Sequence, residues 1–390
     1  MKCVQCAASL DAGVRICPRC RALQPLPANA GAIGPGATLD LGYGRVVIQA
    51  RIGEGGMGVV WRGWLFFAPD GPRGAEAPTP LALKVLQARG GDQSTLRALF
   101  ANEAEALRSL HHANIVRFHD FFEWGGALVL AMELVEGSTF EDLVSRHRAR
   151  ARIRGTTGHD GVSVARSWYY FQQLLGALAA THAIGVVHRD VKPSNVLIRK
   201  DGIVKLSDYG IARLMRSPSA SAETLAPPFS TRSMAVGTGA YMAPEQVLSR
   251  PVDARSDLYS AAIVFYELLA GRPPFSPDEH NEFSLRQAQV EGTPPPLSTF
   301  ARDLPAAIEP LLARALAKDP KYRFTSAIEM GDALRIALGE RDTPEWRAQG
   351  EIASRAPMPD DEPAQTARDA KLRTLRELVV VGYQASNPTR

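Results

Sequence analysis

The chain has 390 residues, of which 45% are hydrophobic, and its 45 Lys and Arg against 41 Asp and Glu give a net charge of only +4. At about 150 residues per domain this length is enough for two or three domains, and the near balance of charge excludes the dense positive field typical of nucleic-acid-binding proteins. Because no apolar run is long enough to cross a bilayer or to form a signal peptide, we expect a folded, cytoplasmic protein without a membrane span.

The four cysteines all lie within the first 20 residues and predict one local metal site rather than a disulfide framework. They form two CxxC pairs, Cys3 with Cys6 and Cys17 with Cys20, ten residues apart. Each pair can supply two thiolates from one tight turn, and two pairs complete a tetrahedral Zn²⁺ site. Residues 1–22 are therefore predicted to be a zinc ribbon, with two metal-free dithiols as the alternative. For its role, docking to a protein is favoured over contact with nucleic acid.

The next part of the chain changes composition at residue 43. Residues 23–42 are rich in Pro, Gly and Ala and are predicted to be a linker. Short β-like runs then recur up to residue 135, broken by one helical stretch at 94–110. This pattern predicts a small β-rich lobe over 43–135 that contains one helix.

A glycine-rich run, Gly53-Glu54-Gly55-Gly56-Met57-Gly58, lies between two of these β-like runs. Glycines let backbone amides approach a triphosphate without a clash from Cβ. A dinucleotide-binding fold is the alternative, but it needs a helix directly after the glycines. Because VVWRGWLFF at 59–67 is typical of a strand, the run is predicted to be a lid over phosphates.

A lysine, Lys84, ends the next apolar stretch, LALK. Lys84 is predicted to be functional if a carboxylate pairs with it. The helical stretch that follows contains two candidates, Glu103 and Glu105. These two lie on roughly opposite helix faces, and Glu103 is favoured by its distance from His112. Such a pair would hold the lysine ammonium on the α- and β-phosphates of ATP.

The segment His188-Arg189-Asp190-Val191-Lys192-Pro193-Ser194-Asn195 is followed after 12 residues by Asp208-Tyr209-Gly210. Phosphoryl transfer needs these residue types. Asp190 would accept or orient the proton of the acceptor hydroxyl, and Lys192 would neutralise the migrating phosphoryl group. Asn195 and Asp208 would hold Mg²⁺ or Mn²⁺.

The remainder of the chain divides into two parts. Apolar residues at helical spacing dominate 136–338, which is predicted to be a larger helical lobe. Residues 339–390 are charged and contain proline, and we expect a partly disordered tail there. Whether this tail binds a protein partner is left open.

With these motifs in family order over residues 43–338, the chain resembles the eukaryotic-type (Hanks-type) serine/threonine protein kinases of bacteria. The resemblance implies an α+β bilobal kinase fold, preceded here by the zinc ribbon. It also implies that the chain binds ATP with the residues that match the family's nucleotide site: Ile52, Gly53, Gly55, Gly56, Gly58, Val60, Ala82, Lys84, Met132 as gatekeeper, Glu133 and Val135 in the hinge, Asn195 and Asp208.

Further roles follow from the same resemblance. It implies that Asp257 anchors the catalytic loop and that Arg323 pairs with Glu245. The chain departs from the family pattern at Tyr209, where phenylalanine is usual, and at Ala113, where proline is common. Neither position touches a phosphate, so activity is expected to persist.

The resemblance also implies regulation through Arg189, because in such kinases this arginine pairs with a phosphate on the activation segment. Thr231 or Ser233 is expected to be the activating site, with Ser230 third. Thr238 is expected to be a fixed hydrogen-bonding partner of the catalytic loop. Lys192 and the Gly237-Thr238 pair are typical of serine/threonine rather than tyrosine kinases.

The chain is thus expected to transfer the γ-phosphate of ATP to Ser and Thr hydroxyls of proteins and of its own activation segment. Two alternatives stand beside this reading. A pseudokinase scaffold would lack at least one of Lys84, Asp190 and Asp208, and all three are present. A nucleic-acid-binding protein built on the zinc ribbon would leave the motifs of 43–338 unexplained.

Overall fold

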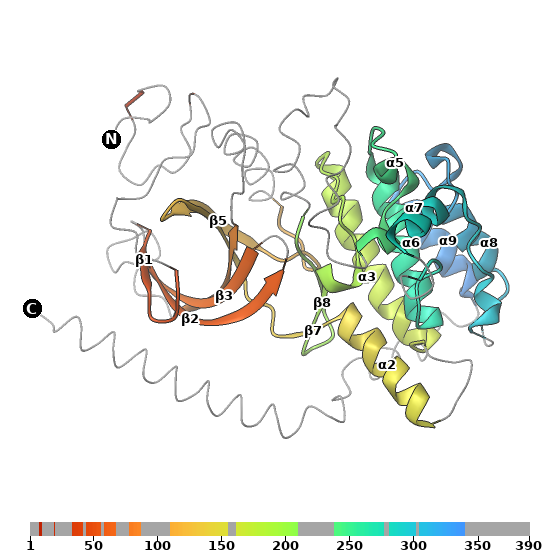
Figure 1. The fold of residues 1–390 in the computed structure, drawn as a ribbon, viewed down its shortest axis with the longest axis horizontal. Coiled ribbons are helices and arrows are strands. Elements are labelled where there is room, and N and C mark those ends of the chain that lie inside the picture. The colour runs from red at the N-terminus through yellow and green to blue at the C-terminus, as the bar shows by residue number, and fades with distance from the viewer. Residues whose placement is uncertain are drawn as a thin grey trace, which may run out of the picture.

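The computed structural model describes a lobe built on a sheet and a lobe built on helices (Figure 1). The statements below concern the residues that it describes, which are 8–9, 19, 33–41, 44–55, 58–67, 78–86, 110–154, 161–209, 238–276, 281–301 and 304–339. The two lobes meet at the small strands β7 and β8, which lie between the large sheet and the helices in Figure 1.

Six of the described strands form one antiparallel sheet in the order β1-β2-β3-β4-β6-β5. Side chains from all six strands pack into a common core on one face of the sheet. On the other face, residues of β4, β5 and β6 such as Leu86, Phe121 and Leu130 join the core of the second lobe. This is the expected β-rich lobe. The strands are β1 (Thr38–Asp40), β2 (Gly44–Gly55), β3 (Gly58–Phe67), β4 (Thr79–Leu86), β5 (Phe118–Trp124) and β6 (Ala127–Glu133).

The end of the predicted linker belongs to this sheet. Strand β1 pairs with Arg45–Val47 of β2, and Leu39 and Leu41 are 0% and 1% exposed. The prediction of a linker up to residue 42 is therefore wrong at this end. The two leucines alternate with Asp40 at the period of a strand, and that period outweighs the Gly- and Ala-rich composition around it.

The second lobe is helical, as expected. None of the helices in the described part of the chain is both long and apolar enough to span a membrane. The helices are α2 (Phe140–Arg154), α3 (Val164–Ala183), α5 (Pro244–Val247), α6 (Ala254–Ala270), α7 (Glu282–Glu291), α8 (Ile308–Ala315) and α9 (Ala327–Ala337).

Helix α6 runs through the middle of this lobe. Every residue from Ser256 to Ala270 is buried, which is what an α-helix without a polar face requires. The N-cap of the helix is Asp253, whose side chain accepts a hydrogen bond from the Arg255 amide at 2.8 Å. It ends at Gly271, which has φ 75° and donates its amide to the Glu267 carbonyl at 2.8 Å. The central position of α6 makes it the support for the loops around it.

A second, smaller sheet connects the lobes and positions the candidate site. It has the order β7-β8-β9, with β7 (Gly137–Thr139), β8 (Val196–Arg199) and β9 (Val204–Leu206). A short 3-10 turn, Pro193–Asn195, leads directly into β8. Because β8 and β9 pair antiparallel, the residue before β8 and the residues after β9 come to the same end of the sheet.

Candidate active site

The loop before β8 has a left-handed residue at Arg189, which has φ 66°. A non-glycine residue in this region costs roughly 1–2 kcal/mol and persists where its surroundings hold it. Asp257 on α6 provides that support, since its Oδ2 accepts the His188 amide at 2.7 Å and its Oδ1 accepts the Arg189 amide at 2.8 Å. Its Oδ2 also lies 2.9 Å from His182 Nε2. The expected anchoring role of Asp257 therefore has a geometric basis.

His188 connects this loop to the segment after β9. Its Nδ1 accepts the Asp190 amide at 3.3 Å, so its Nε2 carries the proton and donates to the Ser207 carbonyl at 2.9 Å. Burial lowers the pKa of this fully enclosed imidazole, in agreement with a neutral ring. The His188 side chain thus connects the backbone of Asp190 to the backbone of Ser207, the residue before Asp208.

The carboxylate of Asp190 is 6% exposed and is held by two neighbours. Its Oδ2 lies 3.0 Å from Lys192 Nζ and accepts a hydrogen bond of 3.0 Å from Asn195 Nδ2. The same Nδ2 donates to the Asp190 carbonyl at 2.8 Å. The amide nitrogen of Asn195 is thus committed to Asp190, which makes its amide oxygen the atom suited to a cation.

Ser207 brings Asn195 beside Asp208. The amide and the hydroxyl of Ser207 both donate to the Asn195 carbonyl, at 2.9 and 3.0 Å. Asp208 follows directly and has φ 57°, a second left-handed residue in the site. Two oxygen-bearing side chains on adjoining segments are a suitable donor set for a hard divalent cation, so the residues fit the expected metal.

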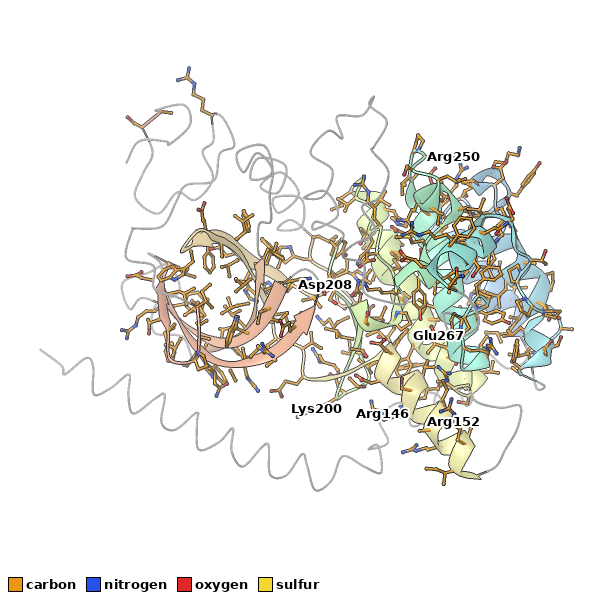
Figure 2. All side chains as sticks on the ribbon, viewed as in Figure 1. Arg146, Arg152, Lys200, Asp208, Arg250 and Glu267 are labelled. Carbon is orange, nitrogen blue, oxygen red and sulfur yellow. The ribbon has the colours of Figure 1, made fainter. Side chains whose placement is uncertain are left out.

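Lys84 and Asp208 join the two lobes (Figure 2 labels Asp208 at their junction). Lys84 Nζ lies 2.6 Å from Asp208 Oδ1. Burial alone would raise the pKa of Asp208, but the charge and hydrogen bond of Lys84 outweigh it and lower that pKa. The carboxylate is therefore held in the ionised form that a metal requires.

The strands of the large sheet align the other nucleotide residues predicted from the sequence. Val60 lies opposite Lys84, and Ala82 lies opposite Met132. The described ends of the glycine-rich run lie in paired strands, since Gly55 ends β2 opposite Gly58, which begins β3. A strand and not a helix therefore follows the glycines, which agrees with a phosphate lid and not with a dinucleotide fold. Gly58 has φ 144°, and a Cβ there would lie 2.0 Å from the Val85 carbonyl oxygen, so this position requires glycine.

A pocket opens between this sheet and the loop that carries Asp208. It contains three of the predicted residues, Lys84, Met132 and Asp208, and otherwise has mainly apolar walls. Its lining residues are Lys84, Leu86, Ile115, Val116, Phe118, Leu130, Met132, Ser207, Asp208 and Tyr209.

The expected ion pair between Arg323 and Glu245 is present in the helical lobe. Arg323 Nη1 and Nη2 each lie 2.8 Å from an oxygen of Glu245, a bidentate arrangement. Ser256 also donates to Glu245. Burial would raise the pKa of Glu245, but its bonds to Arg323 and Ser256 lower it, so the carboxylate is ionised.

Several predicted residues lie outside the described part of the chain. These are the zinc ligands Cys3, Cys6, Cys17 and Cys20, the lid residue Gly56, the lysine partner Glu103, and the phosphosites Thr231 and Ser233. Thr238 is described in its backbone as the first residue of a 3-10 turn, Thr238–Tyr241.

One polar contact of the hinge was missed by sequence reasoning. Lys205, in the middle of β9, is 7% exposed and lies 2.8 Å from Glu133 Oε2, which also accepts the Arg117 amide at 3.1 Å. A lysine between two apolar residues of a short buried strand was the signal, since a buried ammonium requires a partner. The pair fastens the predicted hinge to the strand that leads to Asp208.

Residues 46–333 match a family model described as a protein kinase domain. The chain is 34% identical over 304 residues to the serine/threonine-protein kinase PknL of Mycobacterium tuberculosis, which covers 78% of this chain and 68% of PknL. It is 35% identical over 323 residues to the serine/threonine-protein kinase Pkn1 of Myxococcus xanthus, with 81% of this chain and 42% of Pkn1 covered. The crystal structure of the Mycobacterium tuberculosis PknI kinase domain is similar with a TM-score of 0.56 and 28% identity, over 79% of this chain and 100% of that one.

Proposed function

The chain belongs to the protein kinase family and is a serine/threonine protein kinase, and from this premise we propose which of its residues perform the transfer from ATP. Asp190 orients the acceptor hydroxyl and takes up its proton as the phosphorus–oxygen bond forms. Its fixed contacts with Lys192 and Asn195 support this role, because a positioned carboxylate costs no reorganisation when the reaction occurs. Lys192 neutralises charge on the phosphoryl group in transfer.

We assign the cation to Asp208 and Asn195. When bound, Mg²⁺ or Mn²⁺ would neutralise charge on the phosphate oxygens of ATP. The support is chemical: Asp208 is kept ionised beside Lys84, and Asn195 commits its amide nitrogen to Asp190 and keeps its oxygen for the metal. Glu103 is proposed to hold Lys84 in the nucleotide complex, which would release Asp208 to the cation.

The nucleotide base is assigned to the region below β2, β3 and β4 beside the hinge, next to the pocket that Lys84, Met132 and Asp208 line. Ile52, Val60, Ala82 and Met132 are proposed to form its apolar walls, with backbone groups of Glu133 and Val135 as polar contacts. The Glu133 amide donates to the Arg117 carbonyl at 2.8 Å. Of the two Glu133 backbone groups, the carbonyl is therefore the one we assign to adenine.

Regulation by self-phosphorylation is proposed on the resemblance and on the composition of 210–237. A phosphate on Thr231 or Ser233 would pair with Arg189, and the ion pair would order the segment for substrate. Mapping phosphosites after expression in a kinase-free host tests this, with wild type compared against Asp190→Asn. Equal phosphorylation of the two proteins would refute it.

The zinc ribbon at Cys3, Cys6, Cys17 and Cys20 remains a proposal, and it rests on the CxxC spacing. We propose one Zn²⁺ per chain and a docking role toward another protein. Elemental analysis of the full chain purified without chelators is the test, and protein free of zinc would contradict it.

One observation supports the reaction most strongly: Asp190, Asn195 and Asp208 are held in one place by Ser207, His188 and Asp257. The direct test is incubation of the full chain with γ-labelled ATP, Mg²⁺ and an acceptor protein, followed by phosphoamino-acid analysis. We expect label on phosphoserine or phosphothreonine. Label confined to phosphotyrosine would contradict the assigned specificity.

A further inference from the structure

A glutamine on helix α7, Gln289, is 0% exposed. A buried amide needs partners for both its donor and its acceptor. Gln289 has them: its Nε2 donates to the Ala240 carbonyl, and its Oε1 accepts the Tyr259 hydroxyl at 2.8 Å. The side chain therefore connects three segments that are far apart in sequence, α7, α6 and the turn Thr238–Tyr241.

The rotamer of Gln289 is fixed by its surroundings. Lys318 Nζ lies 2.8 Å from the Gln289 carbonyl and 3.3 Å from the Tyr259 hydroxyl. The same ammonium lies 4.6 Å from the centre of the Phe275 ring. With its backbone and its hydrogen-bond partner both held by Lys318, Gln289 presents its amide nitrogen at a defined point.

The turn that receives this amide is also held by α6. Ser260 Oγ donates to the Tyr241 carbonyl at 2.7 Å, and the Tyr241 hydroxyl donates to Glu267 Oε2 at 2.7 Å. Both contacts act on Tyr241, the last residue of the turn. Gln289 acts on Ala240, one residue earlier, and comes from a different helix.

The turn is coupled to the catalytic loop through its own C-terminal side. The Ala243 amide donates to Gln246 Oε1 at 3.0 Å, and Gln246 Nε2 donates to the Arg189 carbonyl at 2.8 Å. Arg189 directly precedes Asp190. A shift of the turn would therefore move the surface beside Asp190 where an acceptor chain must lie, while the residues assigned to the nucleotide base lie on the sheet of the other lobe.

We propose that Gln289 is a positioning residue for the protein acceptor: through the Ala240 carbonyl it sets the turn Thr238–Tyr241 against the catalytic loop. This rests on the proposed function of Asp190. Its effect falls on acceptor binding and not on ATP binding.

The test uses the full chain with Mg²⁺-ATP and myelin basic protein as the acceptor. Gln289→Glu keeps an oxygen for the Tyr259 hydroxyl and, when ionised, removes the donor to Ala240 but adds a buried charge. Gln289→Met removes both contacts at similar volume and serves if the Glu variant does not fold. Gln287→Met is the matched control, because Gln287 is exposed on the same helix and contacts Glu291 at 3.1 Å.

We expect both Gln289 variants to raise the KM for the acceptor about five- to tenfold, the scale of one lost buried hydrogen bond. The KM for ATP should stay within about twofold, and Gln287→Met should match wild type. An unchanged acceptor KM, or an equal rise in both KM values, would overturn the positioning role of Gln289 and leave the proposed function standing. A wild-type chain that transfers no phosphate would overturn the proposed function as well.

Discussion

The hydroxyls of Tyr209 and Thr181 lie 2.9 Å apart, so the ring that follows Asp208 is fastened to helix α3. Thr181 Oγ1 donates to the Ala177 carbonyl at 2.8 Å, which leaves the Tyr209 hydroxyl as the donor of the pair. The Tyr209 ring centre also lies 4.6 Å from that of His188. The departure from phenylalanine at this position therefore adds a hydrogen bond and leaves the ring packed.

Tyr209→Phe should lower the free energy of unfolding by about 0.5–1.5 kcal/mol, since one net hydrogen bond is lost and Thr181 keeps its bond to Ala177. Activity should remain within about threefold of wild type. Thr181→Val is the comparison: it strands the buried Tyr209 hydroxyl and should cost more, about 1–3 kcal/mol. Urea unfolding measures both, and a larger loss for Tyr209→Phe than for Thr181→Val would count against this pairing.

Arg323→Met should destabilise the fold by about 3–5 kcal/mol, because it leaves the Glu245 carboxylate buried without its cation. The Arg323 side chain is 0% exposed, and it also donates to the carbonyls of Ala317 and Lys318. Lys321→Met, two residues away, removes an exposed ion pair with Asp319 and should leave the stability close to that of wild type, because such pairs are screened by solvent. Equal melting temperatures for the two variants would show that loss of Arg323 does not destabilise the fold as expected.

Glu267 should make stability depend on pH. Burial raises its pKa from 4.5 to about 7, although the Tyr241 hydroxyl opposes the shift. The folded chain thus binds a proton that the unfolded chain releases, so the stabilisation is full below about pH 4.5 and is lost as the pH rises to about 7. Wild type should lose about 3 kcal/mol relative to Glu267→Gln over this range.

Chemical unfolding of wild type and Glu267→Gln at pH 5, 6, 7 and 8 measures this difference. Glutamine keeps an oxygen for the Tyr241 hydroxyl, so the comparison isolates the titration. A stability difference that stays constant with pH, or that grows in favour of wild type toward pH 8, would refute the assignment.

Sequence reasoning could predict the bilobal fold, and it singled out loop residues that the structure brings together, Asp190, Asn195 and Asp208. The constellation from His188 to Asp208 has a fixed spacing, and each residue type has one chemical use there. The β-like runs near 45–53, 59–67, 81–86 and 127–133 in the first lobe also became strands, since their apolar residues alternate or run continuously.

What could not be predicted depends on contacts between distant residues. Nothing local shows that Gln289 faces Ala240 or that Lys205 faces Glu133, because those pairings follow from the packing of whole elements. Strand β5, Phe118–Trp124, was not singled out because FHDFFEW contains Asp and Glu among its aromatics. The Asp120 side chain accepts the Phe121 amide at 2.8 Å and is 3% exposed, so the strand tolerates it.

Asp208→Asn should abolish nucleotide binding that depends on Mg²⁺, because it removes the charge that we assign to the cation. Calorimetric titration with ATP, in the presence of Mg²⁺ or of EDTA, separates Mg²⁺-dependent binding of ATP from binding without the metal. Asp201→Asn is the matched control. Asp201 is exposed, pairs with Arg199 and lies just before β9, the strand that Asp208 follows. Mg²⁺-dependent affinity that survives in Asp208→Asn would contradict the metal assignment.

We propose that Asp190 carries the transfer while other residues bind ATP, and a single comparison of transfer with ATP affinity separates these two roles. Phosphate transfer to an acceptor protein and the Kd for Mg²⁺-ATP are measured on the same preparations of wild type and Asp190→Asn. We expect transfer by Asp190→Asn to fall at least about a hundredfold, with a Kd within about threefold of wild type. Near-normal transfer by Asp190→Asn would contradict it.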